Sequence, residues 1–559
     1  MGSFKKKQLI LFSTLLVSLL MMSNIVSAKS KLSASDWFVK GNHFVEARDY
    51  DNAILAYNET VKLEPKNAYA YIVRGIVYGE KKEYDLAIAD FTKAIELNPQ
   101  AEIAYRSRGL AYCDKGEYDL AIADSTKAIE LEPKKAEAYM NRASAYSNKG
   151  SNDLAIADFS KVLALKPQDG ETYYNRGYVY ISIGQLDLAV ADLTKAIELN
   201  PQFAAAYNNR GVAYAKIKRY DLAIVDYTKV IELNPQFVGA YMNRGNAWAD
   251  KGQDDEAIAD YNKALEINPQ DAEIYFNRGS VYKHKEEYNM AIADYTKAIE
   301  LNPQMAAAYV NRGNAYSDKG QKDVAIADYT KAIELNPQMA KAYDNRGIVY
   351  YNKGDYDVAI ADFNKAIELN PQMADVYHKR GLANYHKGQK DEAIVDYTKA
   401  IELNPQMTIV YADRGFAYYE EGQNEEAIAD FNKAIELNPQ GAEVYNNRGS
   451  AYKDRAQYDM AIADLNKAIE LNPQYTYAYI NRGMVYANKG QNEEAIADYT
   501  KAIELSPQIG DIYFLRAISF HALGREKAAI IDFELFLQYV PSGDTRVEEV
   551  KRIIANYQG

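Results

Sequence analysis

The five histidines and the single cysteine are the residues best suited to metal or nucleophilic chemistry, and their spacing does not support either. His378 and His386 would share one face of a helix, but eight residues of helix separate them by roughly 12 Å, too far to bind one metal ion unaided. Cys113 has no histidine or cation fixed beside it that would activate a thiolate. The sequence also lacks a phosphate-binding glycine loop, zinc-ligand spacing and a nucleophile elbow. We therefore expect no metal, no cofactor and no enzymatic activity.

Arginine and aspartate form two charged columns that recur every 34 residues, from Arg74 to Arg516 and from Asp90 to Asp532. A partly buried arginine needs a partner, because an unpaired charge is costly in a medium of low dielectric constant. Both columns are interrupted together near the start of the chain, where Lys40 and Ala56 replace them. This joint loss favours pairs sixteen residues apart within one unit. We interpret the columns as a ladder of structural ion pairs.

A third column on the same 34-residue grid consists of nine asparagines: Asn141, Asn175, Asn209, Asn243, Asn277, Asn311, Asn345, Asn447 and Asn481. A side-chain amide offers one acceptor and two donors, so a regular row could hydrogen-bond the main chain of an extended peptide. The packing columns do not require asparagine here, and a helix interior would favour alanine. The alternative is that the residue spread when one unit was copied and contacts only water.

The stretch 340–441 is less uniform than the rest of the chain. It carries the aromatic residues Tyr351, Tyr385 and Tyr419 and, close to them, the polar residues Asp344, His378, Lys379, His386, Asp413 and Glu420. Exposed aromatics among mixed charges are typical of interface hot spots. We therefore add Tyr351, His378, Tyr385 and Tyr419 to the candidate peptide-binding residues. The alternative is neutral drift in repeats of little importance.

The elements that position these residues follow from the prolines. All fifteen lie 34 residues apart, from Pro65 to Pro541, and most follow the motif KAIELNPQ or a close variant. Proline in a helix interior removes a hydrogen bond and clashes with the preceding turn, so a helix must end before each one. A fixed period of this length predicts a stacked repeat array with one continuous core rather than separate domains.

Each 34-residue repeat, numbered from Ala34, is predicted to form two helices. In the unit 306–339, Gly320 closes the first helix, as glycine does in ten of the fifteen units. Asp323 opens the second helix, in which Ala325, Tyr329 and Ala332 make a buried stripe. Position 4 is tyrosine or tryptophan, positions 8 and 20 are small, and position 24 is mostly aromatic or leucine. Small residues at 8 and 20 would let the two helices approach closely, while large ones at 4, 11 and 24 fill the space beside them.

These columns resemble the tetratricopeptide repeat (TPR) over residues 34–543, with arginine at position 7 as the main departure from the usual aliphatic residue. The resemblance implies an all-α, right-handed superhelical solenoid of fifteen repeats, with a concave groove lined by the first helices. The asparagine row is similar to that in the TPR superhelix of O-linked N-acetylglucosamine transferase, whose catalytic domain has no counterpart here. Residues 544–559 would form a C-terminal capping helix, with Val547, Val550, Ile554 and Tyr557 on its apolar face.

The first 28 residues have the pattern of a secretory signal peptide, followed by a short lead at 29–33. Lys5–Lys7 form a basic region, Leu9–Met22 an apolar region, and small residues end at Ala28. The apolar region is short for a membrane span, which needs about 20 residues, and an uncleaved membrane anchor is the alternative. The chain is therefore predicted to be exported to a periplasmic, cell-surface or secreted location.

The acidic balance limits the partners. A net charge of −13 repels nucleic-acid phosphates and anionic lipid, so we expect no nucleic acid and no membrane contact except through such an anchor. The predicted function is an exported TPR scaffold that binds proteins or extended peptides along its groove. The alternative is a structural subunit or spacer of an envelope assembly or polysaccharide-export complex. The sequence does not indicate an oligomeric state.

Removal of the signal peptide predicts a mature protein that begins at Lys29, because cleavage is expected after Ala28. Intact-mass measurement of the protein from its native host tests this. A membrane-bound species that retains Met1 would instead establish the uncleaved anchor.

Overall fold

The computed structural model describes residues 32–541 and 543–558, with only the backbone of Tyr557 and Gln558. The predicted signal peptide at 1–28 and most of the lead at 29–33 lie outside this part, as does the side chain of Tyr557. Every element within it is an α-helix, which confirms the all-α prediction. The chain divides into two compact units, one ending at Ile267 and the other beginning at Asn268.

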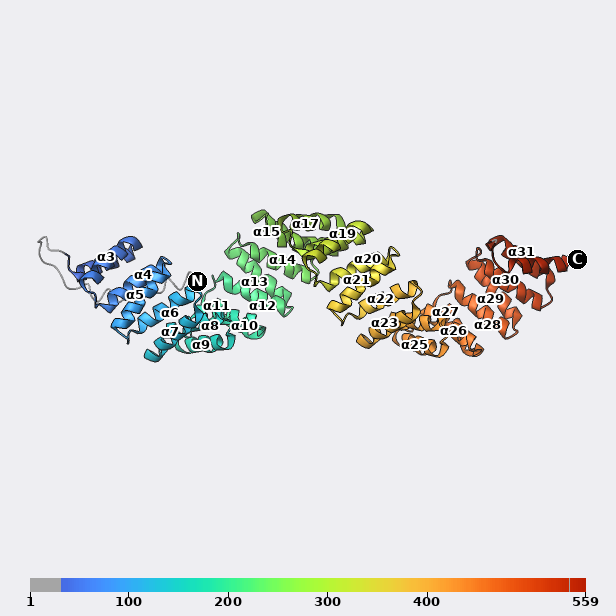
Figure 1. Ribbon diagram of the computed structural model, residues 1–559, viewed down its shortest axis with the longest axis horizontal. Helices are drawn as coiled ribbons and strands as arrows, with labels where there is room; N and C mark the ends of the chain where they lie inside the picture. Colours follow the sequence, from blue (N-terminus) through green and yellow to red (C-terminus); the bar gives the residue numbers. More distant parts are fainter. Residues whose placement is uncertain (1–31, 542, 559) are drawn as a thin grey trace. The chain divides into compact units, whose positions relative to one another are not determined.

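The described residues of the first unit, 32–267, form seven helix pairs. The pairs lie side by side in chain order (Figure 1). Its helices are α2 (Ala34–Glu46), α3 (Tyr50–Leu63), α4 (Ala68–Glu80), α5 (Tyr84–Leu97), α6 (Glu102–Lys115), α7 (Tyr118–Leu131), α8 (Ala136–Asn148), α9 (Asn152–Leu165), α10 (Gly170–Ser182), α11 (Leu186–Leu199), α12 (Ala204–Lys216), α13 (Tyr220–Leu233), α14 (Val238–Asp250) and α15 (Asp254–Ile267).

The second unit contains eight helix pairs and a final single helix. Its helices are α16 (Ala272–His284), α17 (Tyr288–Leu301), α18 (Ala306–Asp318), α19 (Lys322–Leu335), α20 (Ala340–Tyr351), α21 (Tyr356–Leu369), α22 (Ala374–His386), α23 (Lys390–Leu403), α24 (Thr408–Glu420), α25 (Asn424–Leu437), α26 (Ala442–Asp454), α27 (Tyr458–Leu471), α28 (Thr476–Asn488), α29 (Asn492–Leu505), α30 (Gly510–Ala522), α31 (Glu526–Tyr539) and α32 (Val547–Gln558).

The second helix of each pair ends where the proline grid predicts. In α19 the last residue is Leu335, followed by Asn336 and Pro337. The side chain of Asn336 accepts a hydrogen bond from the backbone N–H of Gln338 at 3.1 Å, which stabilises the turn. The motif LNPQ therefore both ends a helix and shapes the connection to the next repeat.

The small-residue columns allow close helix contact, as predicted. A Cβ atom placed on Gly313 would lie 2.8 Å from a ring carbon of Tyr329, so position 8 of α18 lies directly on the aromatic residue of α19. Ala325 and Ala332, on the same face of α19, are fully buried. Interiors packed at this density leave no room for an added methyl group. The core of each repeat thus forms where positions 8, 20 and 24 meet.

The tyrosines at positions 4 and 11 have a different role from the predicted core filling. Most are only half-buried, and they lie on either side of the arginine at position 7. In α16 the guanidinium carbon of Arg278 lies 5.5 Å from the ring centre of Tyr275 and 5.9 Å from that of Tyr282. This distance allows a cation–π interaction. These tyrosines therefore enclose a cation as well as covering apolar surface.

The ion-pair ladder is confirmed within repeats and also connects neighbouring repeats. Arg312 donates from Nε and Nη2 to the two carboxylate oxygens of Asp328, at 2.8 and 2.7 Å. Its third nitrogen, Nη1, donates to the Thr296 hydroxyl of the preceding repeat at 3.1 Å. The same intra-repeat pair occurs in all fourteen repeats that carry both residues. Both side chains are thereby paired, as buried charges require.

The first repeat replaces the ion pair by a simpler contact. Ala56 is buried, and the ammonium group of Lys40 lies 4.9 Å from the Trp37 ring centre and 5.8 Å from that of Phe44. The cation thus keeps its two aromatic neighbours after losing its carboxylate. The paired loss of arginine and aspartate follows from pairing inside the repeat, as the sequence indicated.

The last repeat is covered by α32. Val550 is fully buried, with Ile553 and Ile554 packed against the same cluster of α30 and α31. The Arg546 guanidinium carbon lies 5.0 Å from the ring centres of both Phe514 and Phe536. Arg546 also pairs with Asp511 and Asp544. The apolar end of the array is therefore covered, as the predicted capping helix requires.

The turn after each first helix has a left-handed residue at position 15. The ten glycines there have φ between 69° and 86°. In the other five repeats the same conformation is adopted by Arg48, Lys82, Lys218, Glu286 and Ala456, with φ between 56° and 65°. Residues with a Cβ atom adopt this region at a cost of roughly 1–2 kcal/mol. Five turns therefore contain backbone strain that the glycine repeats avoid.

Breaking one ion pair should destabilise its repeat. Arg312→Leu leaves the buried Asp328 carboxylate without its partner and should cost roughly 3–5 kcal/mol. The double change with Asp328→Ala should recover much of this loss, because the stranded charge is removed. Hydrogen exchange of α18 and α19 measures the local effect. Lys331→Ala is the control, since its pair with Glu334 is exposed; purely additive effects of the two changes would show that Arg312 and Asp328 do not interact.

Relieving the strained turn should stabilise the first unit. Lys218→Gly should raise the unfolding free energy by about 1 kcal/mol, because glycine adopts positive φ without a steric penalty. The reciprocal change in the next repeat, Gly252→Lys, should lower it by a similar amount. Denaturant midpoints of the two variants test the pair. Equal shifts in the same direction would contradict the backbone explanation.

Candidate functional site

The predicted asparagine row lies on the first helices of nine pairs. Asn141, Asn175, Asn209 and Asn243 belong to the first unit, and Asn277, Asn311, Asn345, Asn447 and Asn481 to the second. Asn141 and Asn345 are buried, with 4% and 9% of their surface exposed, and the other seven are half-buried. The row is therefore less accessible than a set of purely solvated side chains would be.

Most of these amides contact the preceding repeat. Asn243 Nδ2 donates to Asn208 Oδ1 at 3.2 Å, and Asn481 Nδ2 donates to Asn446 Oδ1 at 2.8 Å. Asn141 Nδ2 donates to the Arg106 carbonyl at 3.1 Å. Each of these bonds joins position 6 of one repeat to position 5 of the repeat before it. The expectation that packing makes no demand on position 6 is wrong in these repeats, because the amides join consecutive first helices.

Other members of the row bond differently. Asn345 Nδ2 donates to Asn314 Oδ1 at 2.7 Å, and Asn209 Oδ1 accepts from Asn208 Nδ2 at 3.3 Å. Asn447 Oδ1 accepts from the neighbouring Asn446 at 3.2 Å. Because an amide has two donors and one acceptor, one bond leaves part of its hydrogen-bonding capacity for a ligand. The row is thus held in place by internal bonds that do not use all its polar atoms.

Charged side chains in the second unit follow the same register. His378 Nε2 lies 2.7 Å from an oxygen of Asp413, and Lys379 Nζ donates to Asp344 at 2.8 Å. Asp344 also pairs with Lys341 and is only 1% exposed. Positions 5 and 6 of successive repeats therefore face each other, whether they carry amides or charges.

A parallel register joins positions 12 and 13. The Tyr385 hydroxyl donates to Glu420 at 2.5 Å, and the Tyr419 hydroxyl donates to Asp454 at 2.9 Å. Burial, reinforced by these bonds to carboxylates, raises the pKa of Tyr385 and of Tyr419. Both phenols therefore stay protonated as donors at neutral pH.

The structure brings together some of the predicted aromatic residues and adds two more. The ring centre of His386 lies 5.7 Å from the ring centres of both Tyr351 and Tyr385. Tyr356 stacks on His386, and Phe416 lies between Tyr385 and Tyr419. His378 is separate from this group and lies against Tyr397. Sequence reasoning missed Phe416 and Tyr356, although Phe416 at position 9 lies outside the packing columns and could have been noticed.

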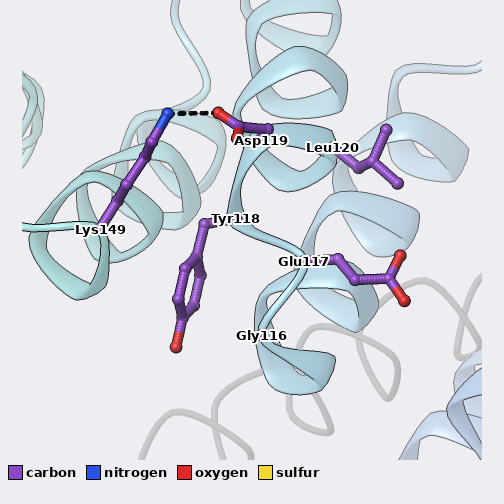
Figure 2. Close-up of a pocket in the computed structure, with 6 residues that line it drawn as sticks. All are labelled: Gly116, Glu117, Tyr118, Asp119, Leu120 and Lys149. Atoms are coloured by element: carbon purple, nitrogen blue, oxygen red, sulfur yellow. Dashed lines mark hydrogen bonds and ion pairs between the residues drawn. The ribbon is translucent and has the colours of Figure 1, made fainter.

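A surface hollow of about 370 Å³ lies elsewhere, at the turn between α6 and α7 (Figure 2). It is lined by Gly116, Glu117, Tyr118, Asp119, Leu120 and Lys149. Lys149 Nζ pairs with Asp119 across it at 2.5 Å. None of its lining residues belongs to the asparagine row or to the aromatic group, so it is not part of the predicted site.

The remaining candidates for chemistry have ordinary surroundings. Cys113 is a half-buried free thiol whose pKa is raised by burial, which disfavours the reactive thiolate. Among the described residues, no cluster of histidine, cysteine and carboxylate side chains could hold a metal ion. In the same part of the chain, no helix has the length and apolar character to span a membrane.

Family comparisons agree with the repeat geometry. The family described as TPR repeat matches residues 109–150, 177–218, 245–285, 313–354, 349–388 and 415–455. Families described as tetratricopeptide repeat match 68–100, 136–169, 204–237, 272–305, 374–407, 442–475 and 476–509. The chain belongs to the TPR family. As a TPR array it is a protein-interaction scaffold, and this class of fold is generally non-catalytic.

Solved TPR structures are similar over parts of the chain. YrrB, described as a TPR protein with an unusual peptide-binding site, is 31% identical, with 35% of this chain and 97% of that chain covered and a TM-score of 0.32. MamA is 31% identical over 31% of this chain and 94% of that chain, with a TM-score of 0.29. A TPR protein from Parabacteroides merdae is 22% identical over 44% and 98%, with a TM-score of 0.36. No curated protein matches the sequence. The likeness to the transferase superhelix stays a prediction.

Proposed function

We propose that this TPR protein is an exported scaffold that binds a protein or extended peptide along the face formed by its first helices. The observation that carries the proposal is the register between positions 5 and 6 of successive repeats, exemplified by Asn208 with Asn243 and by Asn446 with Asn481. It places a polar side chain at position 6 once per repeat in repeats 3–14, from Ser107 to Asn481. A ligand with regularly spaced main-chain amides matches such a periodic surface.

The hydrogen bonds between amides of neighbouring repeats favour ligand binding, although they use part of the amides' hydrogen-bonding capacity. An amide already fixed by a neighbour loses little conformational freedom when a ligand arrives, and this lowers the entropic cost of binding. The donor and acceptor that remain on the amide can then contact main-chain groups, which carry no side-chain identity. The proposed mode is therefore broad recognition of extended backbone.

Export rests on the predicted signal peptide, whose basic residues Lys5–Lys7 precede the apolar run Leu9–Met22. A partner would then be met outside the cytoplasm. A structural role in an envelope assembly remains the alternative, and the composition of the captured material separates it from a peptide binder.

Photo-crosslinking from the two faces tests the binding surface. A photoreactive residue at exposed first-helix positions Ala205 or Ala307 should capture partner proteins in the native compartment. The same residue at Val225 or Val395, exposed at 64% and 68% on second helices, should not. Many captured partners support a peptide binder, and one stoichiometric partner supports a structural subunit. Capture only from the second-helix positions would overturn the proposal.

The asparagine row should contribute to affinity directly. Replacing Asn209, Asn243, Asn277 and Asn311 by alanine should weaken partner capture by two to three orders of magnitude, at about 1 kcal/mol for each lost contact. Because Asn243 also bonds Asn208, we expect some loss of stability as well. Partner binding is therefore measured below the unfolding range of each variant.

The matched control removes four exposed amides from the turns of the same repeats: Gln236, Gln270, Gln304 and Gln338, each replaced by alanine. These changes should leave capture unaffected. Unchanged capture in the asparagine variant would remove the row from the binding site.

A further inference from the structure

Six rings form a continuous aromatic row in repeats 10–12. In order, they are Tyr351, Tyr356, His386, Tyr385, Phe416 and Tyr419, and we call them the aromatic row. Successive ring centres lie 5.7, 5.6, 5.7, 6.3 and 6.4 Å apart. Five of the six residues are half-buried and His386 is exposed, so part of each side chain is accessible to solvent. The row crosses three repeats and comes from α20, α21, α22 and α24.

Tyr351, Tyr385 and Tyr419, at position 12 of their repeats, differ from most tyrosines at positions 4 and 11 in having no arginine over their rings. Elsewhere the arginine at position 7 occupies the rings at positions 4 and 11, as Arg414 does with Tyr411 and Tyr418 at 5.9 Å from each centre. Within the part of the chain that the structure describes, no lysine or arginine lies over Tyr351, Tyr385 or Tyr419. Their faces can therefore accept a cation from outside.

Carboxylates lie along the same row. Glu420 and Asp454 accept the phenol hydrogen bonds of Tyr385 and Tyr419. The negative charge of Asp413 acts on both Tyr351 and Tyr385. A phenol that donates to a carboxylate becomes richer in electron density, which strengthens attraction of a cation to its ring.

The cations nearby do not neutralise these carboxylates completely. Lys390 lies 3.3 Å from Glu420 and 3.2 Å from Glu421, and Lys453 lies 3.3 Å from Asp454. Asp413 is paired with His378, which carries charge only when protonated. Leaving the histidines aside, the carboxylates Asp413, Glu420, Glu421 and Asp454 outnumber the ammonium groups of Lys390 and Lys453, while Lys387 and Asp357 beside the row pair with each other. These side chains therefore carry a net negative formal charge.

We propose that the aromatic row of repeats 10–12 binds a basic, extended peptide segment, with its guanidinium or ammonium groups placed over the rings and beside the carboxylates. Arginine should be preferred to lysine, because a planar, weakly hydrated guanidinium stacks on aromatic faces. The protein uses the same pairing internally at each Arg–Tyr contact. The proposal rests on the proposed function, since it names the partner chemistry of the same first-helix face.

The test measures binding of fluorescent peptides to the full chain by anisotropy. The probes are ten-residue peptides that alternate serine with arginine, lysine, citrulline or glutamate. Arginine should bind best, and citrulline, its neutral analogue of nearly equal shape, about tenfold or more weakly. Equal binding of arginine and citrulline peptides, or stronger binding of the glutamate peptide, would overturn the proposal without any variant of the protein.

Two triple variants locate the site. Changing Tyr351, Tyr385 and Tyr419 together to leucine should weaken arginine-peptide binding about tenfold, whereas changing them to phenylalanine should retain more of it because the rings remain. The matched control changes Tyr69, Tyr178 and Tyr477, exposed at 45%, 56% and 59% in other repeats, to leucine and should have little effect. Full binding by the first leucine variant would contradict the assignment.

The two proposals fail in different ways. If photo-crosslinks form from Ala205 and Ala307 but the arginine and citrulline peptides bind equally, the basic-peptide assignment is wrong and the first-helix face remains a binding surface. If the arginine peptide binds through the aromatic row but partners crosslink only to second helices, the row is a cation-binding site and the proposed function is wrong.

Discussion

In fourteen of the fifteen repeats the central contact is made by the arginine at position 7. One guanidinium group, such as that of Arg312, joins the two helices of its own repeat through Asp328 and reaches the preceding repeat through Thr296. The ring centre of Tyr309 lies 5.6 Å from its guanidinium carbon. Because Nε, Nη1 and Nη2 all donate hydrogen bonds, these bonds offset the cost of removing the charge from water. A single side chain thus links both the two helices of its repeat and the repeat before it. The small residues at positions 8 and 20 allow close helix contact independently of this bridge, since Gly41 packs on Tyr57 in the first repeat, which lacks the pair.

Much of this organisation could be predicted from the sequence because it is local. Proline fixes where a helix ends within one or two residues, so Leu335 and Asn336 fall where the grid indicates. The pairing of Arg312 with Asp328 could be inferred because the first repeat lacks both the arginine and the aspartate of these columns, with Lys40 and Ala56 in their places. The left-handed turn was apparent from Gly320 but not from Lys218, which adopts the same conformation without the residue that signals it.

The candidate site was harder to predict because it depends on how one repeat meets the next. Asn208 and Asn243 are 35 residues apart in sequence and become neighbours in space only because consecutive first helices contact each other. The same geometry brings Phe416 and Tyr356 to the aromatic row from different repeats. Periodicity identifies which columns are exposed, whereas the packing of adjacent repeats decides which exposed residues contact each other. The core is therefore uniform from repeat to repeat, while the contacts on the exposed face vary and join neighbouring repeats.

The loss of the guanidinium bridge in the first repeat makes the two ends of the array unequal. Lys40 has aromatic neighbours but no carboxylate, and Arg48 holds a left-handed turn that glycine would adopt without strain. At the opposite end, α32 and Arg546 close the last hydrophobic cluster. Since each repeat of such an array is stabilised mainly by its immediate neighbours, the repeat of α2 and α3 should be less stable than the described repeats that carry the full ion pair. The two ends of the array should therefore differ in local stability: the last repeat, covered by α32, should resist unfolding more than the first repeat does.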